Sequence, residues 1–182
     1  MTGRGQPACA RAGGIGQDEG VTTASALDPD TEHRIRDSID RQTLLTTLGV
    51  TIAGLASGRV VLDLPYRADL CQQHGYVHAG AITAVADSAC GYAAASLMPA
   101  GRDVLTVEFK VNLLRPARGD WFRATAEVAR AGRTLTVCSA QVVAWAGGRE
   151  QKPVALMQAT MMAVDPGPAG GEEPAPTARP RT

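Results

Sequence analysis

Residues 79–95 of this chain, AGAITAVADSACGYAAA, carry almost only small or apolar side chains, and this run constrains the fold more than any other segment. It has no polar stripe to face water, which predicts a helix buried on nearly all sides. Asp87 interrupts the run. An unpaired carboxylate in a dry interior is costly, so Asp87 either has a neutralising partner or is kept for chemistry. With an acid at its centre and only about 17 residues, the segment falls short of a membrane span.

The chain has 182 residues, enough for one domain with a real core. Its 18 basic and 18 acidic side chains balance, which argues against a nucleic-acid binder held by a cationic field. The cysteines, Cys9, Cys71, Cys90 and Cys138, show no close pair and no metal-type spacing, so we expect reduced thiols. No apolar run resembles a secretory signal, and we therefore expect a cytoplasmic protein without a membrane span.

The two ends of the chain differ in composition from its middle. Residues 1–30 are rich in Gly, Ala, Thr and Arg without periodicity, and residues 165–182 are dense in Pro and Gly. Neither segment can bury an apolar face, so we expect a disordered leader and a disordered tail. One domain is expected between them, over residues 31–164.

Hydrophobic spacing predicts the elements of this domain. An amphipathic helix is expected from Thr31, with apolar residues at helical spacing and Gly49 as its C-cap. Two short β-prone runs, residues 50–56 and 59–64, predict a hairpin closed at Gly58. After the apolar helix, long alternating runs predict a four-stranded antiparallel meander. These runs are residues 103–114, 121–130, 134–145 and 154–164.

A helix that is apolar all round needs cover, so a curved sheet has to wrap it. The segments GYVHAGAITAVADSACGYAA, TVEFKVNLLRPARGD and AGRTLTVCSAQV occur in that order. In this the chain resembles the acyl-CoA thioesterases of the hotdog superfamily, in particular the phenylacetate-pathway branch, which is similar to the 4-hydroxybenzoyl-CoA thioesterases. The resemblance covers roughly residues 33–164. It implies a single α+β hotdog domain that hydrolyses an acyl-CoA, aromatic or medium-chain, without a cofactor.

The start of the apolar helix offers a site for an oxyanion. The N–H groups of Ala79 and Gly80 have no intrahelical acceptor and lie at the positive end of the helix dipole, where they would also contact substrate. Asp87 lies nine residues beyond His78, which is about 13 Å along the axis and roughly half a turn away. One chain cannot bring both groups to the same carbonyl. If both act, the site combines two antiparallel copies, which predicts a two-fold dimer or a dimer of dimers.

The resemblance implies roles for individual residues. Asp87 takes the position of the catalytic carboxylate, as a general base or as a nucleophile, and the sequence leaves both open. Gln72 would position the attacking water or the thioester, and Thr106 would hold the water against the carboxylate. The backbone N–H of Ala79 would form the oxyanion hole. Two departures from the common pattern are Ala79 in place of a glycine and Gln72 in place of an asparagine.

Coenzyme A carries phosphates, which predicts cations at the mouth of the site. Arg115 and Arg118 follow one strand, and Arg130 and Arg133 flank the next turn. The segment AGRTLT resembles a segment near the pantetheine path, so Gly132 and Thr134 are expected to contact substrate as well. For the acyl group, the candidate lining residues are Tyr92, Met98 and Trp121.

Simpler interpretations stay open beside these. Asp87 could pair with an arginine and be purely structural, and His78 is better interpreted as a helix-start residue whose ring bonds to backbone than as a base. His74 and His78 have a spacing found in zinc sites, but Gly75 interrupts it and no metal is expected. A non-catalytic acyl-CoA binder or regulator on the same fold is the alternative function. A hotdog dehydratase would need a histidine paired with its aspartate, which His78 and Asp87 do not resemble.

Overall fold

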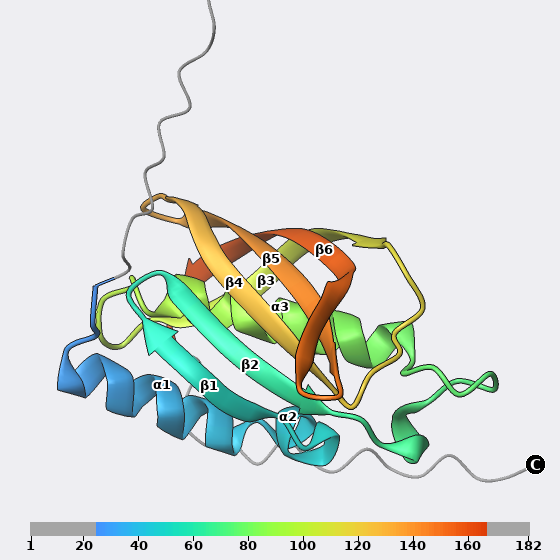
Figure 1. The fold of residues 1–182 in the computed structure, drawn as a ribbon. Helices are drawn as coiled ribbons and strands as arrows, with labels where there is room; N and C mark the ends of the chain where they lie inside the picture. The colour runs from blue at the N-terminus through green and yellow to red at the C-terminus, as the bar shows by residue number, and fades with distance from the viewer. Residues whose placement is uncertain (1–24, 167–182) are drawn as a thin grey trace, which may run out of the picture.

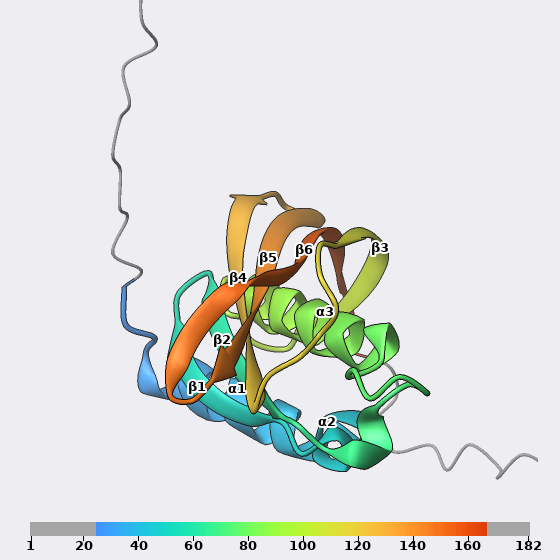
Figure 2. The ribbon, with the colours of Figure 1, turned by 45° about the vertical axis from the view of Figure 1, so that its right-hand side comes forward.

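The computed structural model describes residues 25–166. The expected leader and tail lie mostly outside this range. Within it, a six-stranded antiparallel sheet in the order β1-β2-β4-β5-β6-β3 curves around one helix, α3 (Figures 1 and 2). This is the α+β architecture that the sequence predicted. In chain order the elements are α1 (Pro29–Arg41), α2 (Thr43–Leu48), β1 (Thr51–Ala56), β2 (Arg59–Pro65), a 3-10 turn (Ala68–Leu70), α3 (Ala79–Ala95), β3 (Asp103–Leu113), β4 (Trp121–Ala131), β5 (Leu135–Ala146) and β6 (Arg149–Val164).

The N-terminal helical region is broken in two, and the prediction of one helix from Thr31 was wrong in this respect. α1 begins earlier, at Pro29, with Asp28 accepting the N–H of Thr31 at 2.9 Å, and it ends at Arg41, before Gln42, whose backbone is extended. Ile39 and Leu45 are both buried, although on a straight helix six residues of about 100° each would point their side chains roughly 120° apart. The break at Gln42 lets both side chains face the core. α2 ends at Gly49 in the left-handed conformation, as predicted.

The order of the strands differs from the predicted four-stranded meander. β4, β5 and β6 do form a meander, but β3 pairs with β6 at the edge of the sheet, and β4 pairs with β2 of the predicted hairpin. α3 separates β2 from β3 in the chain and runs beneath the sheet, so β3 enters at the far edge. β6 also starts earlier than predicted, because a register shift accommodates Pro153 opposite Val143.

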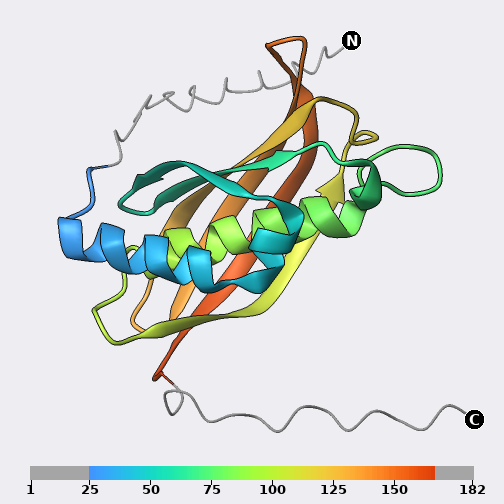
Figure 3. The ribbon, with the colours of Figure 1, turned by 90° about the horizontal axis from the view of Figure 1, so that it is seen from below.

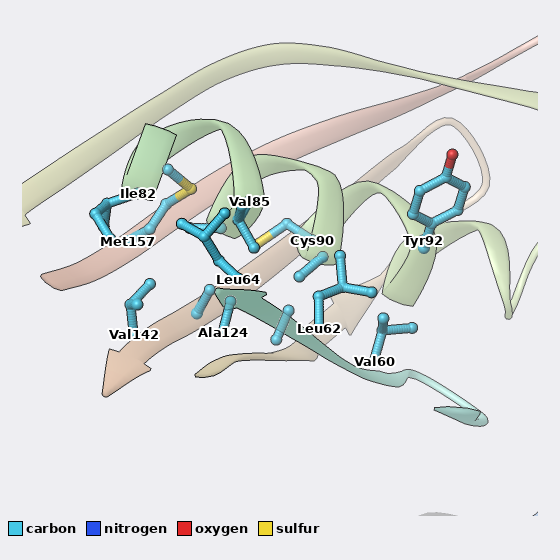
Figure 4. Packing of buried hydrophobic residues seen from close by; sticks show 14 of the residues in the cluster. Val60, Leu62, Leu64, Ile82, Val85, Cys90, Tyr92, Ala124, Val142 and Met157 are labelled. Carbon is cyan, nitrogen blue, oxygen red and sulfur yellow. The ribbon is translucent and has the colours of Figure 1, made fainter. Parts of the chain in front are cut away.

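α3 begins at Ala79 and ends at Ala95, as predicted, and it fills the concave side of the sheet. Ile82, Val85 and Cys90 pack against the inward side chains of β2 and β4 (Figure 4). One stripe of α3 is not fully buried. Its members recur at helical spacing on a single face, which lies between β3 on one side and α1 on the other (Figure 3). They are Gly80, Thr83, Ala84, Asp87 and Gly91.

Arg34 of α1 holds the C-terminal end of α3. Its Nη2 donates to the carbonyl oxygens of Ala95 at 3.2 Å and Met98 at 3.3 Å, just at and beyond the end of α3, where Ala95 also accepts the N–H of Met98 at 3.1 Å. We expect Arg34→Met to lower the free energy of unfolding by about 1.5–3 kcal/mol, since hydrogen bonds to a charged group are lost. Arg36→Met is the matched control because exposed Arg36 only pairs with Glu32, so its cost should stay below about 0.5 kcal/mol. Urea denaturation compares them, and equal losses would contradict this role.

Candidate active site

The entry to α3 leaves one backbone N–H available. His78 is the N-cap residue, and its Nδ1 accepts the N–H of Gly80 at 2.8 Å, which agrees with its interpretation as a helix-start residue. The N–H groups of Ala81 and Ile82 bond to the His78 carbonyl oxygen. Within the described part of the chain, the N–H of Ala79 has no acceptor. Of the two oxyanion donors predicted from the sequence, Gly80 is therefore engaged in capping, and only Ala79 is available.

Gln72 lies in the loop before this helix start. Its Oε1 accepts the N–H of His74, and its own N–H donates to the carbonyl oxygen of Tyr76 at 2.8 Å. Gln72, His78 and Ala79 line a cavity of about 620 Å³. With its Oε1 engaged, the Nε2 group of Gln72 is the part that can donate to a bound molecule.

Asp87 is half-buried and has a hydroxyl partner. Thr106 Oγ1 donates to Asp87 Oδ1 at 2.9 Å, so Thr106 contacts the carboxylate directly. Among residues 25–166, no arginine, lysine or histidine forms a salt bridge with Asp87, so none of these residues supplies the structural ion pair. Burial raises the pKa of Asp87 above its ordinary value, and the hydrogen bond from Thr106 opposes this. A carboxylate with a raised pKa is suited to accepting a proton from water.

A bulge in β3 aims Thr106 at Asp87. The register with β6 shifts at Val107, so that Thr106 lies opposite Met161 while Phe109 lies opposite Ala159. Met161 and Ala159 are both buried, and cross-strand neighbours share a face of the sheet. Thr106 and Phe109 therefore both face the side of α3. Without the bulge, Thr106 and Phe109 would point to opposite faces.

Ala79 and Asp87 do not meet within one chain. They are eight residues apart on a continuous helix, which separates them by about 12 Å along its axis. Asp87 and Thr106 line a second cavity, of about 280 Å³, while Ala79 lines the first. Each chain therefore presents an N–H at one point of α3 and a carboxylate at another.

The predicted substrate-binding arginines separate into two groups at opposite ends of α3. Arg115 lines the cavity of Ala79, and its Nη1 donates to the carbonyl oxygen of Pro153 at 2.7 Å. Nearby, the guanidinium of Arg118 lies 5.1 Å from the ring centre of Tyr76, and its Nη2 donates to the Tyr76 hydroxyl at 3.2 Å. Arg133 lines a cavity of about 500 Å³ beyond the C-terminal end of α3, next to Met98.

The turn between β4 and β5 contains the rest of the second group. Gly132 and Thr134 line the same cavity as Arg133, whereas Arg130 is exposed on β4 and lines none of the cavities described. A Cβ at Gly132 would lie 2.6 Å from the carbonyl oxygen of Leu135, so the turn itself requires glycine.

The three residues suggested for the acyl pocket do not come together. Tyr92 lines the cavity of Asp87, and Met98 lines the cavity at the far end of α3. Trp121 lies on β4 and stacks on Trp145, with ring centres 4.7 Å apart. Only Tyr92 is beside the carboxylate. Its neighbour there, Gln42, was missed because the sequence placed it inside a continuous helix.

The hydrogen bond from Thr106 sets a pH dependence for Asp87. Thr106→Val removes an interaction that lowers the pKa of the carboxyl, so that pKa rises further. Activity that needs the carboxylate is lost as the pH falls through this pKa, and the acid limb of the kcat profile should therefore move to higher pH. Thr160→Val is the matched control, because Thr160 donates to the exposed Glu108. A profile of Thr106→Val that matches the wild-type profile would contradict the assignment.

Among residues 25–166, no helix combines the length and apolar character needed to cross a membrane. The same residues contain no group of three or more His, Cys, Asp or Glu side chains placed to hold a metal ion. The described cysteines, Cys71, Cys90 and Cys138, are free thiols.

A curved antiparallel sheet around one helix, with a carboxylate midway along that helix and a free N–H at its start, defines a hotdog-fold protein with a candidate acyl-transfer site. The sequence profile described as "Thioesterase superfamily" matches residues 74–149. A crystal structure of a thioesterase family protein from Silicibacter pomeroyi is 51% identical, with a TM-score of 0.73, covering 75% of this chain and 99% of that one.

Curated relatives agree. Acyl-coenzyme A thioesterase PaaI of Escherichia coli is 31% identical over 113 residues, 61% of this chain and 75% of PaaI. A Halobacterium salinarum protein named as an esterase is 35% identical to this chain over 124 residues. The match covers 65% of this chain and 82% of that protein. The chain therefore belongs to the thioesterase superfamily, and it is a thioester hydrolase.

Proposed function

We propose that this protein hydrolyses acyl-CoA thioesters in a site that two copies of the chain build together. The observation that carries the proposal is Asp87: a half-buried carboxylate with a hydroxyl donor, no cationic partner among the described residues, and a place on the uncovered stripe of α3. Leaving a carboxylate in this state costs stability, which is typical of groups kept for chemistry. The name of PaaI supports coenzyme A as the thiol portion of the substrate.

The surface around Asp87 supports a two-fold dimer. Phe109 and Leu113 lie on the concave side of β3 and are nevertheless 45% and 54% exposed, and they flank a helix face of small residues. Apolar side chains on an open edge strand favour association with a second copy. An axis near Thr83, midway between Ala79 and Asp87, places the N–H of one copy beside the carboxylate of the other.

The chemistry follows from this pairing. The Ala79 N–H of one copy donates to the thioester carbonyl oxygen, and the Asp87 carboxylate of the other accepts a proton from water as the water oxygen bonds to the carbonyl carbon. The tetrahedral oxyanion then re-forms the carbonyl, the C–S bond breaks, and the thiolate of coenzyme A takes up a proton. In the alternative route Asp87 attacks the carbonyl carbon directly and displaces the thiolate, and water then hydrolyses the resulting anhydride to give the same products. Gln72 Nε2 would orient the thioester or the water.

The same two-fold axis would bring the basic side chains of the two copies together. Two antiparallel copies of α3 bring the helix start of one chain to the same end as the β4–β5 turn of the other. Arg115 and Arg118 of one copy would then face Arg133 of the second across one opening, with Gly132 and Thr134 beside it. Phosphates of coenzyme A would bind between these guanidinium groups. The acyl group, aromatic or medium-chain, lies on the other side of the carbonyl.

Complementation between two inactive variants tests the shared site. In a mixed dimer of Asp87→Asn and Ala79→Pro chains, one site combines intact Ala79 with intact Asp87, while the other site has lost both groups. Random pairing makes half of the dimers mixed with one working site each, so about a quarter of the wild-type rate should return. Thiol release is measured after co-expression with two affinity tags. No recovery in isolated mixed dimers would exclude a shared site.

A further inference from the structure

Two acceptors lie within reach of the Thr106 hydroxyl. Its Oγ1 lies 2.9 Å from Asp87 Oδ1 and 3.5 Å from the sulfur of Met161 on β6. Met161 lies opposite Thr106 in the pairing of β3 with β6, and its side chain is fully buried. A hydroxyl has one hydrogen to donate, so Thr106 can serve only one of the two acceptors well at a time. The sulfur of Met161 therefore competes with the carboxylate for a single hydrogen.

The charge of Asp87 decides which acceptor receives this hydrogen. A carboxylate is a strong acceptor that cannot donate, so Thr106 donates to Asp87 when Asp87 is ionised. When Asp87 carries a proton on Oδ1, its O–H can donate to Thr106 Oγ1. The hydrogen of Thr106 then needs another acceptor, and the thioether of Met161, although a weak one, lies 3.5 Å away. Within residues 25–166, the Thr106 hydroxyl has no third hydrogen-bond partner.

Other ionisable groups surround this pair without bonding to the carboxylate. They come from three elements: Tyr92 and Cys90 on α3, Asp103 on β3 and Arg41 on α1. The hydroxyl of Tyr92 donates to Gln42 instead of Asp87. On β6, the inward-facing neighbours of Met161 are the alanines at 159 and 163, which carry no charge. Thr106 is therefore the group through which Met161 can act on Asp87.

We infer that Met161 is a positioning residue for thioester hydrolysis, because its sulfur accepts the Thr106 hydrogen while Asp87 holds the proton taken from water. The inference rests on the proposed function, in which Asp87 is ionised before water attacks and protonated afterwards. The Thr106 hydroxyl turns from Asp87 to the sulfur as the proton arrives, and it turns back when the proton leaves for the thiolate. Both arrangements keep the Thr106 hydrogen paired at a half-buried site, where an unpaired donor is costly.

Met161→Leu tests this role, because it removes the sulfur with little change in side-chain volume. The ionised arrangement keeps its hydrogen bond, whereas the protonated one loses an acceptor for the Thr106 hydrogen. The pKa of Asp87 should therefore fall, and the acid limb of the kcat profile should move to lower pH by about 0.3–0.7 unit, the effect of one weak hydrogen bond. This shift is opposite to the one expected for Thr106→Val. In a Thr106→Val background, Met161→Leu should leave the limb in place.

Met157→Leu is the matched control. Met157 lies on the same strand in the same buried core (Figure 4), but its partners across the sheet, Val111 and Ala140, carry no hydroxyl. This variant should leave the acid limb at its wild-type position. If Met161→Leu does not fold, Met161→Ile removes the sulfur with a residue that suits a strand.

Carbon NMR of the aspartate carboxyl groups measures the pKa of Asp87 without substrate, and Asp87→Asn identifies its signal. A pKa in Met161→Leu equal to or above the wild-type value would overturn the inference. The same holds for a shift of equal size in the Thr106→Val background, which would mean that Met161 does not act through Thr106. Absence of acyl-CoA hydrolysis by the wild-type protein would instead overturn the proposed function, and the NMR titrations would then decide the exchange of the Thr106 hydrogen by themselves.

Discussion

Replacing Asp87 by asparagine is expected to reduce kcat by roughly 10²–10⁴-fold, the usual contribution of a positioned proton acceptor. Asparagine has nearly the shape of aspartate and can accept the hydrogen bond from Thr106, but it can neither take a proton from water nor attack a carbonyl. Acyl-CoA binding depends on other groups and should persist. Thiol release at saturating substrate measures kcat, and calorimetry with an intact acyl-CoA measures affinity.

The same variant should be more stable than the wild-type protein at neutral pH. Burial raises the pKa of Asp87, so the folded state prefers the protonated form and ionisation costs folding free energy. Wild-type stability therefore falls as the pH rises from the ordinary aspartate pKa through the raised one. Asparagine does not ionise, so the free energy of unfolding of Asp87→Asn should exceed that of the wild-type protein by the full amount above the raised pKa. The two values should converge at low pH. Thermal unfolding at several pH values measures this.

Asp40→Asn is the matched control for both measurements. Asp40 is an exposed carboxylate on α1, and its replacement should change neither kcat nor the pH dependence of stability. If Asp87→Asn hydrolysed thioesters at the wild-type rate, Asp87 would have no part in the mechanism. An inactive variant without the gain in stability would indicate that water reaches the carboxylate more freely than its half-buried position suggests.

Replacing Ala79 by proline should lower kcat by roughly 10²–10³-fold, the cost of removing one oxyanion donor. Proline is well tolerated at the first position of a helix, since the N–H that it lacks has no intrahelical partner there. His78 already has the extended backbone, with φ −60° and ψ 139°, that a residue before proline adopts. The variant therefore deletes one hydrogen atom from the proposed oxyanion hole with little strain elsewhere.

Ala79→Gly is the companion variant. It keeps the N–H and loses only a methyl group, so kcat should stay within a few-fold of the wild-type value, while the helix is destabilised by no more than about 1 kcal/mol. Circular dichroism of both variants should show the helix content of the wild-type protein. Equal activity of the proline and glycine variants would show that the carbonyl oxygen is polarised by another donor.

Much of the fold follows from local pattern. The limits of α3, the hairpin closed at Gly58 and the C-cap at Gly49 were all predicted, because each depends on nearby residues: an unbroken apolar run or a glycine that takes a positive φ. The importance of Asp87 was also visible in the sequence, since it is the one charged residue in an otherwise apolar helix, where burying a charge is costly.

The candidate site was predicted less completely. The sequence indicated Ala79, Asp87 and Thr106, and the structure brings Thr106 and Asp87 into contact. The sequence could not indicate that His78 Nδ1 accepts the N–H of Gly80, because that contact depends on the side-chain conformation of His78. Gln42 carried no signal either, since its distance from Tyr92 depends on where α1 breaks.

The sequence by itself determined which segments are buried, where the central helix begins and ends, and that a carboxylate lies within it. These properties depend on periodicity and on the cost of burying charge, both of which act over a few residues. Only the tertiary structure decided that β3 lies at the edge beside β6, that one face of α3 is uncovered, and that a polar cavity adjoins Asp87. Antiparallel strands with similar alternation can pair in several orders, and the order is chosen by how the whole sheet closes over the helix.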